Sequence, residues 1–269
     1  MKTYAILGHP VSHSLSPKIH NAVFRQLGLA DHSYIALDVL PDQLEGMVHQ
    51  LRTGEYEAFS VTIPHKQAII PFLDELTERA EKVGAVNTVV RKVGRGGKDR
   101  TVRLWGDNTD YFGFEKSLEE ANIIGSNPKK ALVLGSGGAA RAVIAVLSHH
   151  QFQVTVAARN PTGSQLHYHD LNPSDPWSII VNTTPVGMAP DPHASVLTDP
   201  SWFRPDRRYV DIIYTPKMTR FLRLAAQAGA RVISGDRMFL WQAVEQARLF
   251  SGGRQPPVET MEEILLKSL

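Results

Sequence analysis

The feature that most constrains the fold of this chain is a regular alternation of strand-like and helix-like runs. Apolar, strand-like runs cover residues 3–7, 33–39, 59–63 and 86–93, and helix-like patterns cover 17–27, 42–52 and 74–83. Gly28, Gly54 and Gly84 follow the three helical patterns directly, and glycine commonly ends a helix at that position. Strands that alternate with helices form βαβ units, so these runs predict an α/β fold with a mostly parallel sheet.

A second α/β series follows the first. Strands are predicted at residues 130–134, 153–157, 178–182, 208–213 and 231–233, and helices at 111–121, 141–148, 237–250 and 258–269. We therefore predict two lobes, one formed by residues 1–109 plus 239–269 and the other by residues 110–238. In this arrangement the C-terminal helices return to the first lobe.

Composition narrows the class of protein. The chain has 269 residues, of which 42% are hydrophobic and 21% charged, and its net charge is +2, so nothing favours a nucleic-acid or membrane partner. The most basic stretch, residues 91–103, lies between two β-rich runs and is predicted to be a solvated hairpin tip. There is no cysteine, no leader pattern after Met1, and no apolar run of the ~18 residues that a membrane span needs. We expect a soluble cytoplasmic protein.

A glycine-rich turn follows the strand-like run at 130–134. Its residues are Gly135, Ser136, Gly137, Gly138, Ala139 and Ala140, and a helical run comes next. Gly-x-Gly-x-x-Ala between a strand and a helix is typical of a Rossmann-like domain, in which a dinucleotide pyrophosphate binds at the helix N-terminus. After the following strand, Arg159 stands where an NAD enzyme would have an acidic residue. A guanidinium can pair with a 2′-phosphate, so NADP is favoured over NAD. A plain strand-to-helix turn remains the alternative.

The segment 8–21 is unusually polar for a short connection between two core elements. Its hydroxyls at Ser14 and Ser16 could bind a carboxylate or the hydroxyls of a ligand. Ser16 followed by Pro17 is also typical of a helix N-cap with proline at the first helical position. The two interpretations are equally supported by this segment alone.

Two further polar runs carry groups suited to acid–base chemistry. Residues 60–66 end a strand-like run with Thr62, a proline and Lys66, and residues 106–110 place Asp110 just before a helical pattern. The simple alternatives are that Lys66 is a solvated surface lysine and that Asp110 is a helix N-cap.

These runs together resemble the shikimate dehydrogenase family. The matching segments, in family order and over nearly the whole chain, are 8–21, 60–66, 84–88, 106–110, 135–140, 182–188, 211–216 and 238–242. The resemblance implies a substrate domain followed by a Rossmann-like NADP-binding domain. It also implies reversible NADPH-dependent reduction of 3-dehydroshikimate to shikimate, a step in the synthesis of aromatic amino acids.

The resemblance also implies roles for individual residues. Lys66 and Asp110 match the family's catalytic pair, and a lysine held by a carboxylate can protonate the oxygen of a carbonyl that accepts hydride. Residues that match family substrate contacts are Ser14, Ser16, Thr62, Asn87, Asp110, Tyr214 and Gln242. Residues expected to bind the cofactor are Gly135, Ser136, Gly137, Gly138, Ala139, Arg159, Thr184, Val186, Ile212, Gly235 and Met238. As alternatives, Asn87 and Gln242 are buried structural amides and Met238 is core.

The remaining histidines are predicted to bind no metal, because the pairs His149-His150 and His167-x-His169 show no converging ligand set in the sequence. With Ser14 assigned to the substrate, we expect its hydroxyl to have no capping task, whereas Ser16 is expected to serve as both cap and ligand.

The chain departs from the family pattern beside the expected adenosine phosphate. The family's Asn-Arg-Thr is replaced by Ala158-Arg159-Asn160, and no lysine or arginine follows until Arg204. Residues 161–177 contain several prolines and glycines and no helical period, so we predict an irregular connection where relatives form a helix. The preference for NADPH over NADH should therefore be smaller than in a relative with the complete set.

Two other functions remain open at this stage. One is a quinate/shikimate dehydrogenase that uses NAD, which would favour an acidic residue near Arg159. The other is a sensor that binds shikimate without catalysis, which loss of Lys66 or Asp110 would have favoured. The expected partners are small molecules, and the expected oligomeric state is a monomer or homodimer.

Overall fold

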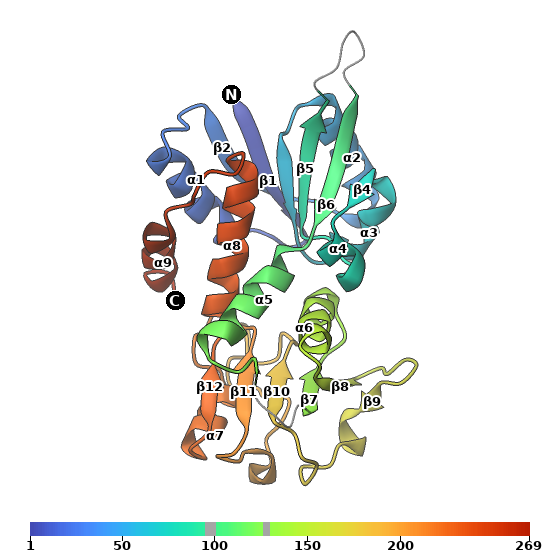
Figure 1. Ribbon diagram of the computed structural model, residues 1–269, viewed down its shortest axis with the longest axis vertical. Coiled ribbons are helices and arrows are strands. Elements are labelled where there is room, and N and C mark those ends of the chain that lie inside the picture. The colour runs from blue at the N-terminus through green and yellow to red at the C-terminus, as the bar shows by residue number, and fades with distance from the viewer. Residues whose placement is uncertain (95–100, 126–129) are drawn as a thin grey trace. The chain divides into compact units, whose positions relative to one another are not determined.

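The computed structural model describes residues 1–94, 101–125 and 130–269. The chain forms two compact units, one made of Met1–Phe112 and Gln242–Ser268, the other of Gly113–Trp241. Each unit is built on its own β-sheet with helices packed against it (Figure 1). Two helices, α5 (Thr109–Glu120) and α8 (Asp236–Phe250), contain the points at which the chain passes from one unit to the other.

The sheet of the first unit has the strand order β2-β1-β3-β5-β6-β4 among the described residues. Its strands are β1 (Lys2–Gly8), β2 (His32–Asp38), β3 (Ala58–Val61), β4 (Glu75–Leu76), β5 (Thr88–Val93) and β6 (Val102–Asp107). The pairs β1–β2, β1–β3 and β4–β6 are parallel, whereas β3–β5 and β5–β6 are antiparallel. The antiparallel pair β5–β6 is the hairpin predicted from the basic stretch, and its tip at 95–100 lies outside the described residues.

Both faces of this sheet are covered, because successive residues of β1 point to opposite sides and both sides are apolar. Ala5 and Leu7 pack in one core cluster with side chains from α2 (Leu44–Thr53) and α4 (Glu78–Val83). Tyr4 and Ile6 pack in another with Phe24 of α1 (Ser16–Gln26) and with the end of α8. The short α3 (His65–Ala68) follows β3.

The last helix, α9 (Val258–Leu266), lies beside α1 in the first unit (Figure 1). Lys18 of α1 donates to the hydroxyl of Ser268 at 3.0 Å. Three-residue 3₁₀ turns, Pro41–Gln43 and Ile70–Phe72, complete this unit.

The sheet of the second unit has the order β12-β11-β10-β7-β8-β9, and every pair is parallel. Its strands are β7 (Lys130–Leu134), β8 (Gln153–Ala158), β9 (Leu166–His167), β10 (Ile179–Asn182), β11 (Arg208–Asp211) and β12 (Arg231–Ile233). Helix α6 (Gly138–His149) connects β7 to β8, and α7 (Arg220–Gln227) packs its Phe221 and Leu222 into the core of this unit. The order reverses between β7 and β10, as in a Rossmann-like sheet.

The predicted alternation of strands and helices is confirmed, with three corrections. The helix predicted at 74–83 begins only at Glu78, because Thr77 caps it and Glu75–Leu76 pairs with β6 instead. The last helix ends at Leu266, and the helices α3 and α7 were not predicted. The predicted irregular connection at 161–177 is confirmed, since it contains only β9 and a 3₁₀ turn, Tyr168–Asp170. Within the described ranges, no helix is both long and apolar enough to cross a membrane.

Candidate active site

The polar runs of the first half of the chain meet at one edge of the first sheet. Strands β1 and β3 are parallel and end at Gly8 and Val61, so the segments after them leave the sheet on the same side. Antiparallel β5 begins at that edge, with Thr88 opposite Ser60, and β6 ends there, with Asp107 opposite Thr88. This topology brings together Thr62, Asn87 and the segment that begins α5.

Lys66 and Asp110 form an ion pair at this edge. The ammonium Nζ of Lys66 donates to Oδ2 of Asp110, and the two side chains are only 13% and 10% exposed. The backbone of Lys66 is fixed because its carbonyl accepts from the amide of Val86 at 2.7 Å. The interpretation of Lys66 as a solvated surface lysine is therefore wrong.

Asp110 is not the N-cap of α5, so that alternative is wrong as well. The side-chain Oδ1 of Asn108 accepts from the amide of Tyr111 at 3.1 Å, which is the bond that an N-cap makes. Because Asn108 does this, the carboxylate of Asp110 is available to Lys66 and to the amide group of Asn87.

Asn87 holds Asp110 in place. Its Nδ2 donates to Oδ1 of Asp110 at 2.9 Å and to the hydroxyl of Thr109 at 3.0 Å. Its Oδ1 accepts from the amide of Thr109 at 2.7 Å and from the hydroxyl of Thr88 at 2.9 Å. Asn87 is 2% exposed, and both the Nδ2 and the Oδ1 of its side chain are hydrogen-bonded to other protein groups. This favours the structural role that the sequence left as an alternative. Contact between Asn87 and a substrate stays a prediction.

The roles expected for Ser14 and Ser16 at the start of α1 are wrong. Helix α1 begins at Ser16, and its N-cap residue is Leu15, whose side chain makes no capping hydrogen bond. It is the hydroxyl of Ser14 that accepts from the amide of Ser16, at 3.2 Å. Ser14 therefore supports the start of the helix, and Ser16 is a buried residue at its first position.

The other predicted substrate residues lie in both units. Thr62 follows β3, half-buried, and Gln242 on α8 is 7% exposed, both in the first unit. Tyr214 belongs to the second unit, where its ring stacks on Phe239 with centroids 4.3 Å apart. Burial raises the pKa of the Tyr214 phenol.

Gln246 is a site residue that the sequence analysis missed. Its Nε2 donates to the hydroxyl of Thr88 at 3.0 Å and to the carbonyl of Asn87 at 3.3 Å. It therefore supports the residue that holds Asp110. The sequence could have indicated Gln246 by its position four residues after Gln242, because this spacing puts both side-chain amides on the same face of α8.

The glycine-rich turn lies at the carboxyl edge of the second sheet, beside the point where the strand order reverses. Gly135 has φ +111°, and a Cβ there would stand 2.6 Å from Oγ1 of Thr183, so only glycine fits. Gly137 has φ −75° and a Cβ there would meet nothing within 4 Å. Since the protein itself does not require glycine at 137, the open space before it fits a ligand that approaches the backbone closely.

The N-terminus of α6 is free to bind an anion. In the part of the chain that the structure describes, no side chain caps this helix, and its first turn has no acidic residue. The amides of the first turn and the helix dipole then favour a negatively charged group, which is what a pyrophosphate supplies.

The remaining predicted cofactor residues also follow strand ends. Arg159 is exposed after β8, Thr184 and Val186 follow β10, and Ile212 follows β11. Gly235 and Met238 lie at the start of α8. Met238 is only 7% exposed, which is compatible with the alternative interpretation of Met238 as a core residue. Whether these side chains touch a cofactor stays a prediction.

Buried Asp211 organises the loops around this edge. Its carboxylate accepts from the amide group of Asn182 at 3.1 Å, from the hydroxyl of Thr219 at 2.7 Å and from the backbone amide of Ile213 at 3.0 Å. Burial raises the pKa of Asp211 to about 6, and these hydrogen bonds offset only part of that effect. These contacts assign Asp211 a structural task, the support of the loops after β10 and β11.

On sequence grounds, no further metal-ligating side chain is expected near the histidine pairs. For His149 and His150 this expectation is wrong. Their imidazoles meet the carboxylate of Glu115, from α5, within the second unit. No pattern in the sequence could reveal this, since Glu115 lies 34 residues before His149.

The chain matches two family models, the shikimate dehydrogenase substrate binding domain over residues 6–89 and the shikimate 5′-dehydrogenase C-terminal domain over residues 237–266. It is 40% identical to the shikimate dehydrogenase (NADP(+)) of Salinibacter ruber, over 93% of this chain and 92% of that protein. Its structure resembles that of the Thermus thermophilus shikimate 5-dehydrogenase in complex with NADP(H) and shikimate, with a TM-score of 0.83, 35% identity and full coverage of both chains. It also resembles the quinate dehydrogenase of Corynebacterium glutamicum in complex with NAD, with a TM-score of 0.84, 27% identity and 99% coverage of each chain.

Proposed function

Because the chain belongs to the shikimate dehydrogenase family, we propose that it catalyses the reversible NADPH-dependent reduction of 3-dehydroshikimate to shikimate. The observation that carries the proposal is the ion pair between Lys66 and Asp110, which is nearly enclosed and lies at an edge of the sheet rich in hydroxyl and amide groups. This reaction is a step of the shikimate pathway.

Lys66 is proposed as the general acid. NADPH, when bound, supplies the hydride that reduces the ketone carbon, and a proton must then reach the ketone oxygen. The ammonium of Lys66 gives that proton as the C–O bond becomes a hydroxyl, and it regains a proton from water. In the direction of shikimate oxidation, neutral Lys66 takes the hydroxyl proton.

Asp110 is proposed to hold Lys66 and to bind a substrate hydroxyl. One of its oxygens accepts from Lys66 and the other from Asn87, so the carboxylate cannot rotate without breaking one of these bonds. Such fixed geometry is what a proton donor requires, because a small misplacement of a reacting group slows the reaction severely. We propose that Ser14, Ser16, Thr62, Tyr214 and Gln242 bind the remaining substrate groups.

The second unit is proposed to bind NADP. The uncapped N-terminus of α6 and the open space before Gly137 fit a pyrophosphate, and Arg159 offers a guanidinium for the 2′-phosphate. No second lysine or arginine follows Arg159 before Arg204, so we propose a moderate rather than a strict preference for NADPH.

The test is the oxidation of NADPH by the purified protein with 3-dehydroshikimate, repeated with Lys66→Ala and Asp110→Asn. Each variant should lose about 100-fold or more in kcat, the usual contribution of a positioned acid or base. Lys82→Ala is the matched control, because Lys82 also forms an ion pair with a carboxylate but lies on the exposed face of α4. Turnover retained in both site variants would refute the proposed pair, and no turnover by the wild-type protein would refute the reaction.

The quinate/shikimate dehydrogenase activity is the second candidate, supported by the structural similarity to a quinate dehydrogenase. It predicts oxidation of quinate with NAD at a kcat/KM equal to or above that for shikimate with NADP. The exposed Arg159, in place of an acidic residue, argues against this outcome. A sensor without catalysis would bind shikimate and show no turnover with either cofactor.

We further propose that the protein acts in the cytoplasm as a monomer or homodimer. The absence of cysteine from the sequence is compatible with a reducing compartment. Sedimentation of the purified protein would measure the oligomeric state.

A further inference from the structure

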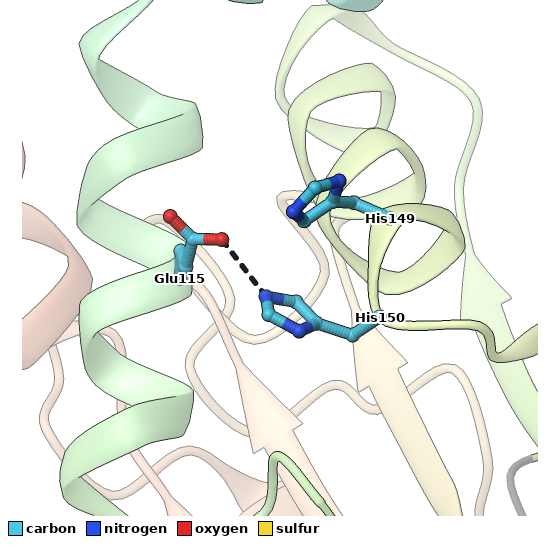
Figure 2. A group of neighbouring side chains, drawn as sticks. All are labelled: Glu115, His149 and His150. Carbon is cyan, nitrogen blue, oxygen red and sulfur yellow. Dashed lines mark hydrogen bonds and ion pairs between the residues drawn. The ribbon is translucent and has the colours of Figure 1, made fainter.

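Outside the proposed active site, three metal-ligating side chains converge within the second unit. Glu115 projects from α5 toward the end of α6, and His149 and His150 face it from that end (Figure 2). One ligand atom from each residue lies within 4.8 Å of the others. Among the residues that the structure describes, this is the single group of three such side chains.

The distances are compatible with one ion held by all three side chains. Nε2 of His150 lies 2.8 Å from Oε1 of Glu115, and the two imidazole centroids are 5.0 Å apart with their planes at 81°. Ligand atoms at ~2.0–2.2 Å around a tetrahedral zinc are about 3.3 Å from one another. Small rotations of the three side chains therefore bring their ligand atoms to the distances that zinc requires, without movement of either helix.

The two histidines are neighbours in sequence at the C-terminal end of α6. Successive residues of an α-helix point about 100° apart, so a His-His pair in a helix interior diverges. Here His149 is the last residue of α6, and His150 follows it with φ −85° and ψ 22°, which departs from helical geometry. Both imidazoles nevertheless lie near the carboxylate of Glu115 (Figure 2).

The surroundings also favour a cation. The carbonyl end of a helix carries partial negative charge, so a positive ion at the end of α6 is stabilised by its dipole. The side chains of His150 and Glu115 are 19% and 23% exposed, and His149 is exposed. Partial burial weakens competition from water at two ligands, while the third leaves a path by which an ion can enter.

The donor set selects the class of ion. Two imidazole nitrogens and one carboxylate oxygen suit zinc and the late first-row divalent ions, whereas magnesium and calcium require mostly oxygen ligands. We propose that Glu115, His149 and His150 form a binding site for a divalent transition-metal ion of the zinc type, which joins α5 to α6. Water would complete the coordination of the ion.

The experiment is calorimetric titration of the untagged, full-length protein with zinc chloride in metal-free buffer, followed by cobalt(II) titration with visible absorption spectra. One ion should bind per chain, and Glu115→Gln and His149→Ala should each weaken binding by about tenfold or more, since even residues behind the ligands contribute that much. Cobalt should give the strong visible bands of a four-coordinate site in the wild-type protein and not in Glu115→Gln or His149→Ala.

His49→Ala is the matched control, because His49 is an exposed histidine on α2 of the first unit and does not belong to the group. Melting temperatures measured in chelator check that the variants are folded. Absence of saturable zinc binding would overturn the proposal and leave a simple hydrogen bond between His150 and Glu115. Equal affinity of the wild-type protein and both site variants, or equal loss in His49→Ala, would also overturn it.

Discussion

Gln246 links two halves of a buried hydrogen-bond network in the first unit, and its replacement by leucine tests that network. The hydroxyl of Tyr34 donates to Ser60 at 2.6 Å, and the hydroxyl of Ser60 donates to Oε1 of Gln246 at 3.0 Å. Nε2 of Gln246 then donates to Thr88 and to the carbonyl of Asn87. Gln246→Leu keeps most of the side-chain volume and removes these three bonds of the amide.

The expected loss of stability follows from what each partner retains. The carbonyl of Asn87 still accepts from the amide of Val61 at 2.7 Å, and the hydroxyl of Thr88 still donates to Oδ1 of Asn87. Ser60 is only 2% exposed, and its hydroxyl loses the acceptor to which it donates. The orphaned Ser60 donor costs about 1–3 kcal/mol and the other two lost bonds about 1 kcal/mol each, so the free energy of unfolding should fall by about 3–5 kcal/mol.

The assay is urea unfolding of Gln246→Leu, Ser60→Ala and the double variant, with Gln26→Leu as the control. Gln26 is exposed on α1 in the same unit, so its replacement should change stability by less than ~0.5 kcal/mol. The double variant should be more stable than the sum of the single losses by about 1 kcal/mol, because it lacks both the Ser60 hydroxyl that Gln246→Leu orphans and the Gln246 acceptor that Ser60→Ala orphans. Strict additivity, or a Gln246→Leu protein as stable as the control, would refute the reasoning.

Three other predictions concern the second unit. The folded pKa of Asp211, about 6, exceeds its unfolded value of 3.8, so its contribution to stability is complete below pH 3.8 and is lost as the pH rises through 6. This loss is about 3 kcal/mol, so between pH 4 and 6 the free energy of unfolding should fall less, or rise more, with pH in Asp211→Asn than in the wild-type protein; the same slope in both would contradict the assignment. Arg159→Ala should raise the KM for NADPH about tenfold and leave that for NADH unchanged in steady-state kinetics, since only NADPH carries the 2′-phosphate. Gly137→Ala should preserve the melting temperature, because its Cβ meets open space, but should weaken NADPH binding measured by fluorescence titration; a large loss of stability would disprove the role inferred for that space.

The sequence predicts this fold well where local pattern and tertiary pairing agree. Strands β7 and β12 have the predicted bounds because each is a short apolar run between turn residues. Residues 74–83 show the opposite case, in which helix-favouring glutamates at 75 and 78 predict one helix. Pairing of Glu75–Leu76 with β6 overrides that local preference, and the helix starts only after the cap at Thr77.

The candidate site was predictable as a set of residues, whereas the roles within the set were not. Lys66 and Asp110 could be paired through the family motifs, but the choice between Ser14 and Ser16 as the hydroxyl at the start of α1 depends on where the helix begins. A shift of one residue reverses the two roles, and local sequence does not define a helix end that closely. The meeting of Glu115 with His149 and His150 depends on the packing of α5 against α6, which no local pattern encodes.

The short outer strands of the second sheet have a consequence for self-association. A strand at a sheet edge offers unpaired amides and carbonyls to which another chain can add by β-pairing, and such pairing leads to aggregation. The outer strands here are β9, with two residues, and β12, with three, so each edge offers few groups in register. Pro161 and Pro173 on either side of β9 lack the amide hydrogen that would extend it. The irregular connection around β9 thus protects this unit from growing into a larger intermolecular sheet.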